Sequence, residues 1–117
     1  SELVRLRSLD ISISGGEPLE QREALVSLLF WIKNLQNIYD KGTTLLYTGF
    51  ELDDFKEENW GILCDYIVTG PFLKSKAFGK VKKSFVGSSN QRVWRVNGKG
   101  KYKELGLNEY GYLEKED

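Results

Sequence analysis

The chain has 117 residues and no net charge, with 40% hydrophobic residues, 29% charged residues, one cysteine and no histidine. This length and balance predict one soluble globular domain spanning residues 1–117. The missing histidine excludes a Ser-His-Asp or Cys-His mechanism and a His-ligated zinc site, and the single cysteine excludes an internal disulfide. No apolar run approaches the roughly 20 residues of a membrane span, and no stretch has the order of a signal peptide, so we expect a cytoplasmic protein.

The charges fall into three blocks. Residues 1–73 carry twelve acidic and six basic side chains, residues 74–103 carry ten basic and no acidic ones, and the remainder carries five acidic and one basic. So basic a segment attracts anions, such as phosphates or an acidic protein face. The alternative is a solvated loop that balances the charge of the rest of the molecule.

Strand and helix patterns alternate along the first half of the chain. Residues 9–14 alternate apolar and polar side chains, which predicts a strand that ends at the glycine pair 15–16. Residues 19–35 place apolar side chains three or four apart, which predicts an amphipathic helix. After a turn signal at 40–42, the β-branched and aromatic residues 43–48 predict a second strand.

The second half is less regular. Residues 51–63 predict one or two short acidic helices. Their inward-facing side chains are expected to be Leu52, Phe55, Ile62 and Leu63. Five further segments are expected: a strand at 64–69, a basic loop or edge strand at 79–84, a strand at 91–96, a turn at 97–100 and a candidate flexible tail at 98–117.

Strands that alternate with helices predict parallel pairing through right-handed crossovers, so the expected class is α/β. Ligands of such folds gather at the carboxyl ends of the strands. Two predicted strands end there in glycine-containing turns, Ser14-Gly15-Gly16 and Thr48-Gly49. We therefore expect a binding site at this edge of the sheet.

The first of these turns continues into Glu17 and Pro18 at the start of the predicted helix. Paired glycines let a ligand approach the backbone, and the N–H groups that follow suit a carboxylate or phosphate. The Glu17 carboxylate could hold an ammonium group, so the turn suits a zwitterion such as an amino-acid headgroup. The alternative is a plain tight turn in which Glu17 only complements the helix dipole.

Four segments, in order, resemble conserved elements of the radical-SAM activating proteins of anaerobic ribonucleotide reductase. Residues 13–21 (Ile-Ser-Gly-Gly-Glu-Pro-Leu-Glu-Gln) resemble the GGE-type turn that holds the amino group of S-adenosylmethionine. Residues 45–50 (Leu-Leu-Tyr-Thr-Gly-Phe) and 65–72 (Asp-Tyr-Ile-Val-Thr-Gly-Pro-Phe) resemble the next two strand ends. Residues 87–92 (Gly-Ser-Ser-Asn-Gln-Arg) resemble the element most specific to these activases.

The resemblance implies a partial (βα) barrel of the radical-SAM type, with a mostly parallel sheet and helices on one face, of which residues 1–117 are the C-terminal portion. It implies S-adenosylmethionine and a [4Fe-4S] cluster as cofactors, and the glycyl-radical protein of anaerobic ribonucleoside-triphosphate reductase as the partner. The cofactor-binding residues would be Ser14, Gly15, Gly16, Glu17, Pro18, Thr48 and Gly49. A partner or substrate loop would comprise Gly87, Ser88, Ser89, Asn90, Gln91 and Arg92, although short polar residues also form local turns and caps. The corners at 15–16 and 87–92 would face a common pocket.

One departure from this family concerns the cluster. The family holds it with a CxxxCxxC loop upstream of the GGEP turn, but none of the fourteen residues before Gly15 is cysteine. We interpret Cys64 as a small core hydrophobe, so no catalytic residue and no metal ligand is expected in this chain, which alone should not make a radical. We expect a fragment or truncated product; the alternative is a degenerate relative.

Two other functions are left open by the sequence. The first is a non-catalytic module that binds the reductase or another protein. The second is nucleic-acid binding through residues 74–103, which we rank last because its aromatic side chains, Phe78, Phe85, Trp94 and Tyr102, are scattered. No membrane partner is expected. Strand edges exposed by a missing βα unit would favour a homodimer or aggregation.

Overall fold

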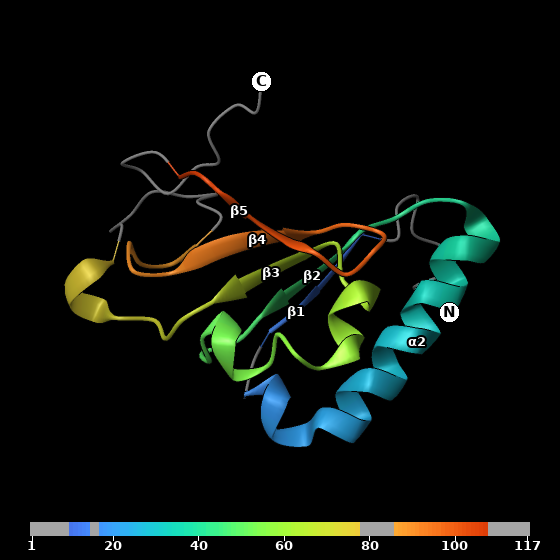
Figure 1. Cartoon of the computed structure of the whole chain (residues 1–117), viewed down its shortest axis with the longest axis horizontal. Coiled ribbons are helices and arrows are strands. Elements are labelled where there is room, and N and C mark those ends of the chain that lie inside the picture. The colour runs from blue at the N-terminus through green and yellow to red at the C-terminus, as the bar shows by residue number, and fades with distance from the viewer. Residues whose placement is uncertain (1–9, 15–16, 78–85, 108–117) are drawn as a thin grey trace.

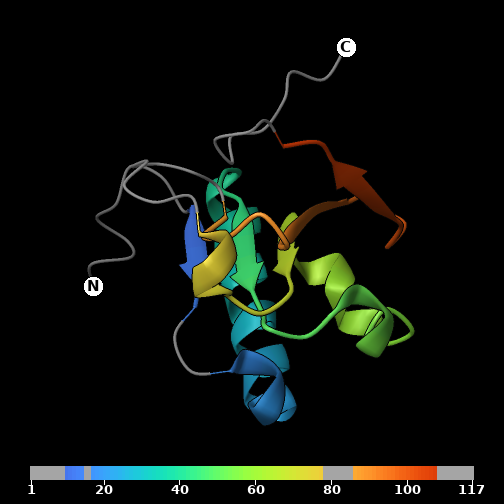
Figure 2. The same ribbon diagram turned by 90° about the vertical axis from the view of Figure 1, so that its left-hand side faces the viewer.

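The protein, seen in a computed structural model that describes residues 10–14, 17–77 and 86–107, is built on a five-stranded mixed sheet. The strands lie side by side in chain order, with β1 and β5 at opposite sides of the sheet (Figure 2). The elements are β1 (Ile11–Ile13), the 3-10 helix η1 (Pro18–Gln21), α2 (Arg22–Tyr39), β2 (Thr44–Tyr47), the 3-10 helices η2 (Leu52–Asp54) and η3 (Asn59–Leu63), β3 (Tyr66–Thr69), η4 (Lys74–Lys76), β4 (Arg92–Val96) and β5 (Tyr102–Leu105).

The first half of the fold follows the sequence pattern. Strands β1, β2 and β3 are parallel, with Ser12 opposite Leu45 and Leu46 opposite Ile67. Helix α2 ends where Asp40 adopts the left-handed conformation with φ 52° and the Lys41 N–H donates to the Gln36 carbonyl at 3.0 Å. The predicted amphipathic helix, three strands and intervening turn are therefore confirmed. No helix in the described part of the chain is long and apolar enough to span a bilayer.

The second half overturns the expected partial (βα) barrel with its mostly parallel sheet. Strand β4 is antiparallel to β3, and β5 is antiparallel to β4. Between residues 10 and 107, outside the two gaps, α2 is the single α-helix, and the crossover from β2 to β3 consists of the short 3-10 helices η2 and η3. The protein is thus a small, mostly-sheet domain.

Two side-chain hydrogen bonds explain the reversal. The Gln91 side-chain amide donates to the Gly70 carbonyl at 3.0 Å, and the Asn90 amide donates to the Pro71 carbonyl at 2.8 Å. These bonds fix the start of β4 beside the end of β3, so β4 has to run back along it. Asn97 then accepts N–H groups from Lys99 and Lys101, which closes a hairpin too short to join parallel strands. Strand β5 lies within the segment 98–117, which the sequence marks as a candidate tail.

Two hydrophobic clusters lie on the two faces of the sheet. The larger includes Leu29, Leu46 and Ile67 and is covered by α2, η2 and η3, which all lie on one side of the sheet (Figure 1). The smaller comprises Val68, Val86, Val93 and Leu105.

The inward-facing residues predicted between 51 and 63 are mostly correct. Phe55 is buried and stacks on Trp60, with 5.2 Å between ring centroids. Leu52 and Leu63 are partly buried against the larger cluster. The expectation for Ile62 was wrong, because its side chain is 41% exposed.

Replacing Gly61 by alanine should destabilise the fold. A Cβ at Gly61 would overlap the Tyr102 hydroxyl and stand 2.9 Å from the ring carbon Cζ. Overpacking of this kind costs about 1–3 kcal/mol, so urea denaturation should show a lower midpoint. Gly98→Ala is the matched control, since nothing lies within 4 Å of its added Cβ. Tyr102→Phe added to Gly61→Ala should recover part of the loss; equal midpoints for both alanine variants would contradict this packing.

Candidate functional site

The Glu17 carboxylate joins the turn after β1 to the end of β2. Its Oε2 accepts hydrogen bonds from the Thr48 hydroxyl at 2.8 Å and from the Leu19 N–H at 2.8 Å, and its Oε1 accepts the Gly49 N–H at 2.7 Å. Thr48 is buried, so its hydroxyl depends on this acceptor. Glu17 therefore holds two strand ends and the first turn of η1 together.

A cavity of about 140 Å³ opens beside this carboxylate, at the carboxyl ends of β1, β2 and β3. It brings residues of the first predicted group together with Gln91 of the second. Its lining is Ser14, Glu17, Pro18, Tyr47, Thr48, Gly49, Gly70, Phe72 and Gln91. Gly15 and Gly16, the centre of the predicted turn, lie outside the described residues.

Three lining residues were absent from the predicted site residues. Gly70 and Phe72 belong to the segment 65–72, which follows the same strand-end pattern as the other turns and could have been included on that ground. No pattern in the sequence indicated Tyr47 as a site residue. Burial raises the pKa of its phenol above the ordinary value. Phe72 is 59% exposed, so an aromatic side chain stands at the edge of the cavity.

The charge of this cavity decides which headgroups it suits. Glu17 is the one ionisable carboxylate or base among its lining residues. The N–H groups of Leu19 and Gly49, which could have received a ligand's carboxylate or phosphate, already donate to Glu17. A carboxylate oxygen has two acceptor positions, so Oε1 retains one. The geometry therefore suits a positively charged headgroup such as an ammonium.

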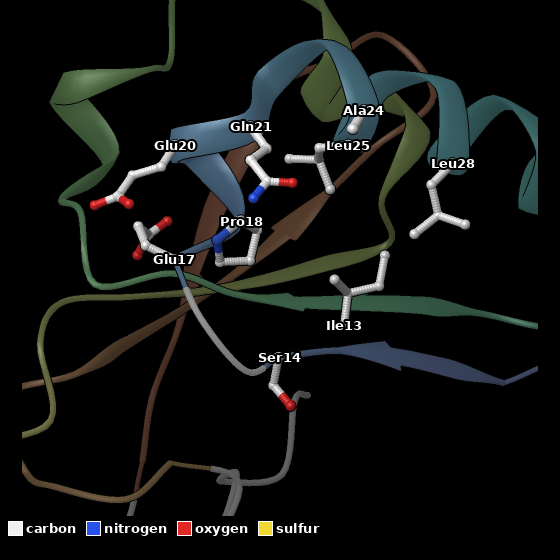
Figure 3. A pocket seen from close by; sticks show the side chains of 9 residues that line it. All are labelled: Ile13, Ser14, Glu17, Pro18, Glu20, Gln21, Ala24, Leu25 and Leu28. Atoms are coloured by element: carbon white, nitrogen blue, oxygen red, sulfur yellow. The ribbon is translucent and has the colours of Figure 1, made fainter.

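A second cavity, of about 380 Å³, lies between β1 and the start of α2. Ile13 and Leu28 face each other across it (Figure 3). Ser14, Glu17 and Pro18 line both cavities. The two cavities therefore adjoin at these three residues.

The loop 87–92 is mainly held by its own hydrogen bonds. Ser88 is buried; its hydroxyl donates to Asn90 Oδ1 at 2.6 Å and accepts the Leu73 N–H at 3.2 Å. The Gln91 Oε1 accepts the N–H groups of Gly87 and Ser88 at 2.8 and 3.0 Å. Within this loop Gln91 lines the cavity beside Glu17. The hydrogen bonds of Asn90 and Gln91 to the Pro71 and Gly70 carbonyls also set the direction of β4.

Another cavity, of about 410 Å³, lies beside β5 and shares Gln91 with the cavity beside Glu17. Ser89, Asn90 and Arg92 contribute to its lining. The Arg92 guanidinium lies 3.6 Å from the Glu104 carboxylate, so its charge already has an acidic neighbour within the chain.

An iron–sulfur cluster does not fit the residues present. Cluster iron requires cysteine thiolates, and Cys64 is the only cysteine in the sequence. Cys64 is buried in the larger hydrophobic cluster, and burial raises the pKa of its thiol to about 12. Among the residues that the structure describes, no three cysteine, aspartate or glutamate side chains are grouped as metal ligands.

Comparison with known proteins gives one family match. The profile described as "4Fe-4S single cluster domain" matches residues 2–94. No curated protein and no solved structure matches the chain. The matched residues include all the segments that line the cavity beside Glu17.

Glu17→Ala should destabilise the protein because it removes the acceptor of three donors. A buried donor left unsatisfied costs about 1–3 kcal/mol, so the free energy of unfolding should fall by roughly that amount or more. Glu20→Ala is the control, since Glu20 is an exposed carboxylate in the same turn and its loss should change stability by less than about 0.5 kcal/mol. Equal urea midpoints for the two variants would show that the carboxylate clamp is not needed.

The Cys64 thiol should resist alkylation in the folded protein. With a pKa of about 12 and a buried side chain, almost none of it is thiolate near neutral pH, and iodoacetamide cannot reach it. Mass spectrometry should detect alkylation only after urea is added. Anaerobic incubation with ferrous iron and sulfide should likewise leave the ultraviolet–visible spectrum without an iron–sulfur band. Rapid alkylation in native buffer would contradict the burial of this thiol.

Proposed function

Because this chain belongs to the 4Fe-4S single cluster domain family, we propose that it is a portion or degenerate relative of a radical-SAM activase. In this proposal the activase uses S-adenosylmethionine to generate a glycyl radical on anaerobic ribonucleoside-triphosphate reductase, and this chain contributes binding of S-adenosylmethionine. The observation that carries the proposal is that three segments far apart in the sequence line one cavity. They are the turn containing Glu17, the end of β2 at Thr48, and Gln91 before β4.

The chemistry of the cavity supports a ligand with an amino-acid headgroup. The ammonium of such a headgroup would complement the Glu17 carboxylate, whose Oε1 keeps one acceptor position, and the Ser14 hydroxyl can donate or accept. S-adenosylmethionine carries a sulfonium charge as well, so its net charge is positive and opposite to that of the lining. A cavity of about 140 Å³ is smaller than the roughly 300–1,000 Å³ of whole-ligand sites, so it accommodates the headgroup and leaves the nucleoside outside.

The chain's own part in the reaction is limited to binding. Its single buried thiol cannot hold a cluster, because cluster iron requires several thiolates. We therefore expect no cleavage of S-adenosylmethionine by the chain alone.

A second candidate function is a non-catalytic module that binds the reductase or another protein. Its support is the pair of exposed apolar side chains that follow β3, Phe72 at 59% and Leu73 at 38% exposure. Such a module would bind the reductase without binding S-adenosylmethionine, so the following titration separates the two functions.

Isothermal titration of the chain with S-adenosylmethionine should show binding that Gly49→Ala weakens by about tenfold or more. A Cβ at Gly49 would stand 3.4 Å from Glu17 Oε1 and 3.9 Å from Pro71 Cα, so it fits the fold but enters the space of the headgroup. One lost charge-assisted hydrogen bond is worth about 1.5–3 kcal/mol, which corresponds to this change in affinity.

Gly98→Ala, remote from the cavity, should bind as the unchanged chain does. Methionine, which keeps the headgroup but lacks the sulfonium and the nucleoside, should compete more weakly. The absence of any heat with S-adenosylmethionine, or equal affinities for both alanine variants, would refute the binding proposal.

A further inference from the structure

The segment that follows β3 exposes apolar and basic side chains side by side. Every residue from 71 to 77 is exposed, including the large apolar residues Phe72 and Leu73 and the two lysines of η4, Lys74 and Lys76. Helix η4 projects beyond the carboxyl end of β3, away from α2 (Figure 1). We call these four residues the η4 surface. Exposed apolar side chains rimmed by polar ones are typical of a surface that binds another molecule.

The loop 87–92 holds the backbone of this surface in one shape. The Leu73 N–H donates to the hydroxyl of the buried Ser88 at 3.2 Å, and the Ser89 N–H donates to the Lys76 carbonyl at 2.8 Å. A solvated loop that only balances charge needs no such anchors. A surface that is ordered in advance loses less conformational entropy when it binds a partner.

The Phe72 ring is also held against the loop. A Cβ added at Gly87 would stand 2.9 Å from Phe72 Cδ1 and 3.2 Å from Cε1, so the ring lies directly against the Gly87 backbone. The Gly87 N–H in turn donates to Gln91 Oε1 at 2.8 Å. Phe72 is thus packed where it meets Gly87 and yet remains exposed, which suits it to contact an apolar side chain of a partner.

The charge of the η4 surface is positive, and the surrounding sequence does not neutralise it. No acidic residue occurs between Asp65 and Glu104. Within the described part of the chain, neither Lys74 nor Lys76 forms an ion pair. Residues 77–91 contain three further lysines, so the segment that follows contributes only positive charge. The η4 surface therefore attracts an anionic partner.

The neighbouring residues favour an acidic protein segment over a nucleic acid. Phe72 lines the cavity that contains Glu17, and a Cβ added at Gly70 would stand 3.3 Å from Glu51 Oε1, so two carboxylates lie close to this surface. A continuous phosphate backbone would be repelled there, whereas a protein segment can confine its acidic residues to the lysines. Leu73 offers no ring on which a base could stack.

We propose that the η4 surface binds an acidic protein segment that carries at least one large apolar side chain. The apolar side chain packs on Phe72 and Leu73, and carboxylates of the segment pair with Lys74 and Lys76. The proposal rests on the second candidate function, whose partner it defines by chemistry. It holds whether or not the cavity beside Glu17 binds S-adenosylmethionine.

A labelled peptide, Glu-Asp-Leu-Glu-Phe-Asp-Glu, tests this chemistry by fluorescence anisotropy with the full chain. Binding should saturate at micromolar concentrations of the chain and should weaken by about tenfold or more when salt is raised from about 0.01 M to about 1 M, because salt screens exposed charges. A peptide with Gln and Asn in place of the acidic residues should bind at least about tenfold more weakly, and so should one with Ser in place of Leu and Phe.

Reversing the lysine charges tests the surface itself. The double variant Lys74→Glu with Lys76→Glu should weaken peptide binding by about tenfold or more, because it replaces two attractions by two repulsions. Lys99→Glu with Lys101→Glu is the matched control, since it makes the same change at the same spacing in the exposed turn between β4 and β5. The control should weaken binding by less than about threefold.

Alanine variants of two exposed phenylalanines test the apolar contact. Phe72→Ala should weaken peptide binding by about tenfold, as expected for a central aromatic contact. Phe30→Ala, which changes an exposed side chain on α2, should bind as the unchanged chain does.

Four outcomes would overturn the proposal. They are the absence of peptide binding, equal effects of the two double lysine variants, equal effects of the two alanine variants, and equal binding of the acidic and uncharged peptides. The last outcome would leave the second candidate function in place with a partner of different chemistry.

Two further measurements separate other occupants of the η4 surface. Tighter binding of oligothymidylate than of the peptide, lost in the Lys74→Glu and Lys76→Glu double variant, would assign the surface to nucleic acid and overturn the proposal. The two double lysine variants should have equal midpoints in urea denaturation. A lower midpoint for the variant at 74 and 76 alone would show that the chain itself covers these lysines, which would also overturn the proposal.

Discussion

One carboxylate fixes the geometry at the carboxyl end of the parallel strands. Glu17 follows β1 in the chain, yet its carboxylate accepts hydrogen bonds from Thr48 and Gly49 at the end of β2. It also accepts the Leu19 N–H in η1. Because α2 begins directly after η1, these bonds also set where the helix begins and how its buried side chains meet the sheet. The two cavities that share Ser14, Glu17 and Pro18 follow from this constraint.

The family and the residues of the chain disagree on one point, which is the set of ligands for the iron–sulfur cluster. The family match covers residues 2–94, yet the one cysteine of the chain cannot by itself hold a cluster. Cys64 cannot compensate, because the environment that stabilises it in the core also suppresses its thiolate. The described residues form an acidic recess beside Glu17, with the exposed aromatic side chain of Phe72 at its edge.

The sequence predicts local structure well and long-range pairing poorly. The strands around Ser12, Leu46 and Ile67 and the helix between them were foreseen because periodicity is a local property. The antiparallel return of β4 was missed because it rests on bonds from Asn90 and Gln91 to carbonyls about twenty residues earlier, which no periodicity encodes. Ile62 was misplaced since a 3-10 helix turns every three residues and not every 3.6.

The same contrast holds for the candidate site. The strand-end rule brought Ser14, Glu17 and Thr48 to one place in advance, and the motif at 87–92 added Gln91. The sequence did not indicate that Glu17 would accept the N–H groups of Leu19 and Gly49. Nor did it indicate that the 87–92 loop would mainly form hydrogen bonds that hold the loop itself and the start of β4.

The strands lie in the sheet in the order in which they are translated. Each strand leaving the ribosome pairs with the one made just before it, so the sheet can assemble vectorially during synthesis without waiting for a distant partner.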